Sequence, residues 1–85
     1  MTEVLAVFRS RAQAIDCNTR LNHSGIRSAV INTPKEANVG CGLSVKIPAN
    51  QLARAKMLIA NARYSAFYGY YTMQNVYGRI YIIRM

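Results

Sequence analysis

Acidic residues are the scarcest part of this sequence. Its 85 residues include only three, Glu3, Asp16 and Glu36, against eleven Lys and Arg. Because these carboxylates are widely separated, a mechanism based on paired carboxylates has no obvious partners. The resulting net charge of +8 favours anionic partners such as nucleic acid, phosphate, an acidic protein or an anionic thiol adduct. It fits equally well a basic surface that only keeps the protein soluble.

Metal ligands are also few. One His and two Cys, without a C-x-x-C pair, fall short of a zinc site, which needs about four closely spaced ligands, so no metal and no cofactor is expected. The N-terminal residues lack a basic leader before a long apolar run, and no apolar stretch approaches the ~20 residues that span a bilayer. We therefore expect a cytoplasmic protein that does not enter a membrane, with both thiols free.

Apolar residues, in contrast, are abundant. They make up 52% of the chain, whereas charged residues make up only 16%. A chain of this size and composition predicts one domain over residues 1–85, with a core that needs no disulfide. Many apolar residues with little charge also favour a homo-oligomer, with a homodimer as the simplest form.

Hydrophobic periodicity predicts an alternation of strands and helices. The sequence Ser10 to Gln13 matches the S-x-x-Q capping box, and Gly25 is typical of a helix end. Gln74-Asn75 has the composition of a turn. The expected elements are a strand at 3–8, a helix at 10–25, a strand at 26–31, a loop at 33–42, a strand at 43–47, a helix at 49–62, and strands at 66–73 and 76–83.

This βαββαβ order predicts an α+β fold. The expected form is a two-layer, ferredoxin-like sandwich with an antiparallel sheet in the strand order 4-1-3-2 and both helices on one face. The extra C-terminal strand would extend one edge of the sheet or pair with another chain.

The predicted topology places one cysteine near a helix start. The loops at 8–11 and 33–42 lie at the same end of the sandwich, so Cys41 would approach the first turn of the first helix. Free backbone N–H groups and the helix dipole at that turn stabilise a thiolate. Cys41 is therefore the candidate catalytic thiol. The candidate anion- or adduct-binding group comprises Arg9, Ser10, Arg11, Lys35, Gly40 and Gly42.

Other interpretations of the two thiols remain open. Cys41 also fits a loop cysteine without a role, and Cys17 shares a helical face with Ala14 and Leu21, which favours a place in the core. A Cys–His nucleophile is disfavoured because His23 lies at the far end of the first helix, about 20 Å from its start at 1.5 Å per residue. The sequence thus leaves an enzyme open but favours a non-enzymatic protein.

Several of these residues occur together in a known pattern. An apolar strand is followed by Ser10 and a helix with Ala14 and Leu21, and then by Gly25-Ile26, Thr33-Pro34 and Cys41-Gly42. Over roughly residues 3–60 the chain resembles a small bacterial family described as selenium/sulfur (Se/S) carrier-like proteins. The resemblance implies the βαββαβ fold and Cys41 as the family's cysteine. It also implies a persulfide-type sulfur or selenium adduct, with donor and acceptor proteins as partners.

The chain ends in a tyrosine-rich segment. In its last strand Tyr77, Arg79, Tyr81 and Ile83 fall on one face. Such a face fits sheet packing, a homodimer interface or the stacking of bases. The third strand lacks the aromatic pattern of an RNA-recognition motif, so nucleic acid is an unsupported partner. The alternative function is a basic oligomeric module that binds protein or nucleic acid through this Tyr/Arg face.

Overall fold

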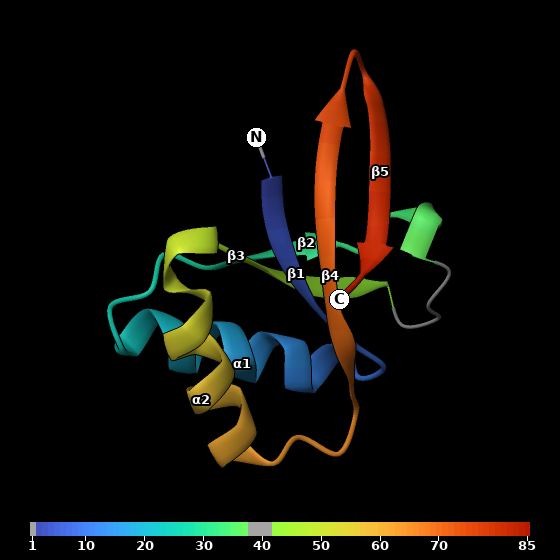
Figure 1. Ribbon diagram of the computed structural model, residues 1–85. Coiled ribbons are helices and arrows are strands. Elements are labelled where there is room, and N and C mark those ends of the chain that lie inside the picture. Colours follow the sequence, from blue (N-terminus) through green and yellow to red (C-terminus); the bar gives the residue numbers. More distant parts are fainter. Residues whose placement is uncertain (1, 38–41) are drawn as a thin grey trace.

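The computed structural model in Figure 1 describes residues 2–37 and 42–85. Within them, two helices and a five-stranded antiparallel sheet form an α+β fold, as predicted. The elements are β1 (Thr2–Phe8), α1 (Arg11–His23), β2 (Ala29–Asn32), η1 (Lys35–Ala37, a 3₁₀ turn), β3 (Leu43–Ile47), η2 (Ala49–Gln51, a second 3₁₀ turn), α2 (Leu52–Ala62), β4 (Phe67–Val76) and β5 (Arg79–Arg84).

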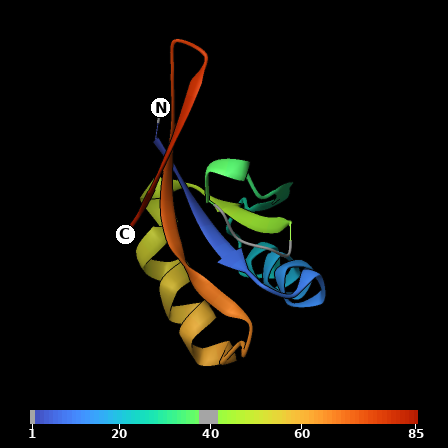
Figure 2. The same ribbon diagram turned by 90° about the vertical axis from the view of Figure 1, so that its right-hand side faces the viewer.

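The strands lie in the order β2-β3-β1-β4-β5. β5 therefore extends the edge of the sheet beyond β4, which is one of the two positions expected for the last strand. The tip of the β4–β5 hairpin projects away from the helices in both views (Figures 1 and 2). β1 is central, between β3 and β4, so its C-terminal end lies beside the starts of both neighbours.

Local interactions define both ends of α1. The Ser10 hydroxyl accepts a hydrogen bond from the Gln13 backbone N–H at 3.2 Å, which confirms the predicted cap. Gly25 has φ +84°, and Ile26 N–H donates to the Leu21 carbonyl at 3.0 Å, so the helix ends in a Schellman motif. The other half of the capping box is absent, because the Gln13 amide bonds instead to Ser65 Oγ and to the Ala66 N–H.

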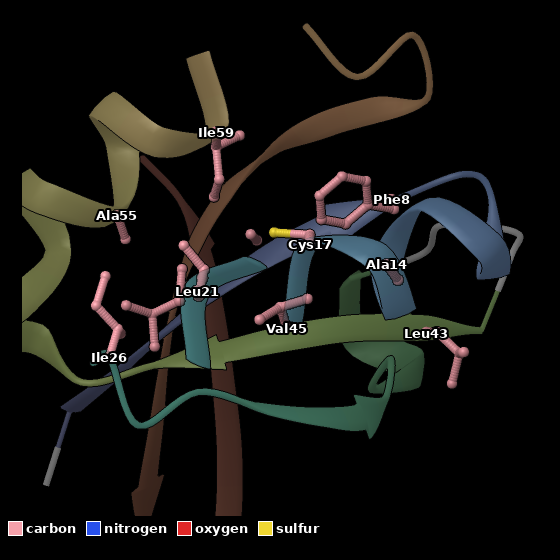
Figure 3. Packing of buried hydrophobic residues seen from close by; sticks show 11 residues of the cluster. Phe8, Ala14, Cys17, Leu21, Ile26, Leu43, Val45, Ala55 and Ile59 are labelled. Carbon is pink, nitrogen blue, oxygen red and sulfur yellow. The ribbon is translucent and has the colours of Figure 1, made fainter. Parts of the chain in front are cut away.

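The main core lies between the sheet and the two helices. The inward residues of α1 are Ala14, Cys17 and Leu21, as the helical spacing predicts. They pack against alternate residues of β1 and β3 and against Ala55 and Ile59 of α2 (Figure 3). Burial of this apolar surface is the main favourable contribution to the folding of so small a chain.

The opposite face of the sheet carries a second, smaller cluster. Leu5 and Val7 of β1 are fully buried there beside Tyr71 of β4. Ile82 of β5 packs against the same cluster, and β5 also contacts η1. A strand buried on both faces explains why residues 4–8 form an unbroken apolar run instead of an alternating one.

Three predicted boundaries were wrong. The last turn lies at Tyr77-Gly78, not at Gln74-Asn75, which continue β4 and pair with β5. Both turn residues have positive φ, +50° and +80°, as a two-residue type I′ hairpin requires, and Gly78 supplies one of them at no steric cost. The second strand begins only at Ala29, because residue 26 completes the end of α1. The second helix begins with the separate turn η2.

Candidate functional site

Two residues of the predicted site, Ser10 and Arg11, lie at the N-terminus of α1, which is positively charged. Arg11 is the first residue of the helix, and Ser10 is its N-cap. The first turn of α1 holds no acidic side chain. Because unpaired N–H groups and the dipole make this end positive, Arg11 adds to a field that favours an anion.

Gly42 lies beside that end. A Cβ added to Gly42 would lie 3.8 Å from Arg11 Nη1. Its φ of +87° is one that residues with side chains rarely adopt. The Gly42 carbonyl accepts a hydrogen bond of 2.8 Å from the Thr33 N–H, which joins the two ends of the predicted 33–42 loop. The structure thus brings Gly42 close to the Arg11 guanidinium.

The remaining predicted residues differ in outcome. Cys41 and Gly40 lie outside the described residues. Lys35 is exposed at the start of η1. The Ser10 hydroxyl oxygen is engaged as the cap of α1.

Arg9 belongs to a cluster that sequence reasoning missed. Its guanidinium lies 4.5 Å from the Tyr68 ring centroid, and that of Arg84 lies 4.9 Å from the same centroid. Arg84 Nη2 also donates to the Tyr68 carbonyl at 3.0 Å. Gly69 leaves room for this arrangement, because a Cβ there would lie 3.1 Å from Arg84 Nη2. Arg9 is therefore held by an aromatic ring of β4, which the predicted thiol site did not include.

Cys17 is a core thiol, as predicted. It is free and buried, and its sulfur lies among the apolar side chains in Figure 3. Burial, together with the nearby Asp16 carboxylate, raises the pKa of the Cys17 thiol to about 12. This sulfur stays protonated near neutral pH and is a poor nucleophile.

The predicted Tyr/Arg face of the last strand is exposed. Tyr77 is fully exposed at the hairpin tip, and Tyr81 and Ile83 are also exposed. On the opposite face of β5, Ile82 is half-buried and packs against the second cluster, whereas Ile80 is exposed. No helix among residues 2–37 and 42–85 is long and apolar enough to cross a membrane.

Comparisons with known proteins give one finding. The family model described as "Putative Se/S carrier protein-like" matches residues 3–69. This range runs from β1 into the start of β4 and leaves out β5. No curated protein and no solved structure matches the chain significantly.

Proposed function

Because the chain belongs to the Se/S carrier protein-like family, we propose that it is a non-enzymatic thiol carrier that holds sulfur or selenium on Cys41. A donor protein would load the thiol and an acceptor protein would unload it. The proposal includes the ferredoxin-like form of the sandwich, with β5 as an addition to it.

One observation supports this role above the others. Gly42, the residue bonded to Cys41, lies beside Arg11 at the positive end of α1. Cys41 precedes Gly42 in the sequence, so the proposed adduct site would include this cationic position. A guanidinium and a helix N-terminus favour the thiolate over the thiol, and the thiolate is the nucleophile in sulfur transfer.

The transfer needs no external oxidant. The Cys41 thiolate attacks the terminal sulfur of a persulfide donor, R–S–SH. The S–S bond of the donor breaks and R–S⁻ leaves, while a new S–S bond gives Cys41–S–SH. An acceptor thiolate removes the terminal sulfur by the same step in reverse, so charge and redox state balance at each stage. The proposed surroundings of the adduct comprise Arg9, Ser10, Arg11, Lys35, Gly40 and Gly42.

Mass spectrometry after incubation with glutathione persulfide tests the proposal. The protein is expected to gain one sulfur atom, and Cys41→Ser is expected to lose that gain. Cys17→Ala is the matched control, since its buried thiol should contribute nothing. Arg11→Gln should slow the loading of Cys41 and raise the pKa that controls it. A wild-type protein that gains no sulfur, or that gains it on Cys17, would contradict the proposal.

The exposed outer strand supports a second candidate. Tyr81 and Ile83 lie exposed on β5, at the edge of the sheet, in a chain of net charge +8. An edge strand with exposed apolar side chains can pair with another chain. In this alternative the protein is a basic oligomeric binding module and Cys41 has no role. Sedimentation that shows an oligomer disrupted by Tyr81→Lys, without any sulfur adduct, would favour it.

A further inference from the structure

A cavity that opens to solvent lies between α2 and the start of β4. Its volume is about 430 Å³, within the usual range of small-molecule sites. One helical face of α2, with the spacing i, i+3, i+4 and i+7, forms one wall. The lining residues are Lys56, Ile59, Ala60, Arg63, Tyr64, Phe67 and Tyr70.

The aromatic wall of this cavity is preformed. The Phe67 and Tyr70 ring centroids are 4.8 Å apart, and Phe8 packs edge-to-face against Tyr64 and Phe67 from the core. The Tyr64 hydroxyl donates to Asp16 Oδ2 at 2.7 Å, which fixes the position of its ring. A ligand would therefore meet ordered rings and lose little affinity to ordering them.

The charge of the lining is positive. Lys56 and Arg63 are its two charged residues, and no described acidic residue lines the cavity or pairs with either. Lys56 Nζ lies 5.2 Å from the Tyr70 ring centroid. Burial raises the pKa of both Tyr64 and Tyr70 to about 12, so these phenols remain neutral and do not offset the two cations.

The backbone of Arg63 is a further sign of a specific role. Arg63 ends α2 in the left-handed region, with φ +54°, a position where glycine is the usual residue. A side chain in this conformation costs free energy that glycine would avoid. In return, the chain retains a guanidinium at the wall of the cavity.

We propose that this cavity binds a small organic anion with a planar aromatic body. The rings of Phe67 and Tyr70 would contact the planar body, and Lys56 and Arg63 would bind its carboxylate, sulfonate or phosphate group. The site is independent of the Cys41 thiol and does not rest on the carrier function.

Fluorescence titration with 8-anilinonaphthalene-1-sulfonate tests the site, with uncharged N-phenyl-1-naphthylamine as the matched probe. Lys56→Gln/Arg63→Gln should weaken binding of the sulfonate by about threefold or more, the scale of two partly exposed ion pairs, and leave the neutral probe unchanged. Arg27→Gln/Arg79→Gln removes the same charge elsewhere and should change neither. Ala60→Phe should fill the cavity and weaken both probes.

Two results would overturn the proposal. Equal losses in the two double variants would show that only net charge attracts the sulfonate. Unchanged binding of both probes to Ala60→Phe, folded by circular dichroism, would place them outside the cavity. If Ala60→Phe does not fold, ring-proton NMR shifts decide: shifts at Phe67 and Tyr70 on adding the sulfonate to wild type support the site, and their absence contradicts it.

Discussion

The Cys17 thiol is the clearest single-residue link between packing and chemistry in this chain. Its place among Ala14, Leu21 and the sheet raises its pKa from an ordinary 9.0 to about 12. In the unfolded chain the thiol loses its proton near its ordinary value. Between these two values the unfolded state therefore binds fewer protons than the folded state, and stability falls as pH rises.

We expect the free energy of unfolding to fall by about 2 kcal/mol between pH 8 and pH 10.5 through Cys17 alone. Urea unfolding at a series of pH values measures this slope. Cys17→Ala should be less stable at pH 8 but should lose less stability on going to pH 10.5. Cys41→Ser is the control that retains the Cys17 thiol, and its stability should fall at least as much as that of wild type, because the proposed Cys41 thiolate would add stability over the same pH range. An identical slope in Cys17→Ala would show that the buried thiol does not contribute.

For single residues, the sequence predicted local roles in a helix but not contacts between strands. Ser10 and Cys17 were predictable because a cap and a helical face depend only on near neighbours in the chain. The contacts of Arg9 and Arg84 with Tyr68 were not, because they depend on the pairing of β1, β4 and β5 and on the irregular register at Val7/Phe8. Periodicity carries no information about such a shift in register.

At the scale of elements, the β4–β5 hairpin shows why turn composition alone misled. Gln74-Asn75 is polar, but both residues pair with β5, whereas the turn includes an aromatic residue. Gly78 next to Tyr77 was the usable signal, since a two-residue hairpin turn needs positive φ at both positions. The order of strands and helices was predictable because it follows from hydrophobic patterning, which is averaged over many residues.

Tyr77→Asn should stabilise the protein by roughly 0.5–1 kcal/mol, because asparagine tolerates a positive φ better than tyrosine does. Tyr77 is fully exposed, so its removal costs no buried surface. Urea unfolding gives the change directly. Gly78→Ala, at φ +80°, is the opposite test and should destabilise the same turn. A Tyr77→Asn protein no more stable than wild type would mean that the turn stores no strain.

At the scale of the whole molecule, β5 is an addition that the fold uses. The family match ends at residue 69, yet Ile82 and Arg84 help to cover the second face of the sheet around Leu5 and Val7. The predicted extra strand is therefore part of the packing and not only a surface for a partner. Its Tyr81 and Ile83 remain exposed, which is where the oligomeric alternative would act.

The net charge of +8 gives a final prediction for the molecule as a whole. Cations that lack a nearby carboxylate repel one another in the folded state, so removing one should relieve repulsion. Arg79 is exposed and has no ion pair among the described residues, whereas Lys46 Nζ lies 3.3 Å from Glu3 Oε2. Arg79→Glu should be neutral or stabilising by about 0.5 kcal/mol, and Lys46→Glu should destabilise by a similar amount.

Urea unfolding at low salt and at 0.5 M NaCl, where the Debye length falls to roughly 4 Å, should show both differences shrink. The same effect from both substitutions at low salt would mean that net charge, and not local pairing, sets the electrostatic contribution to stability.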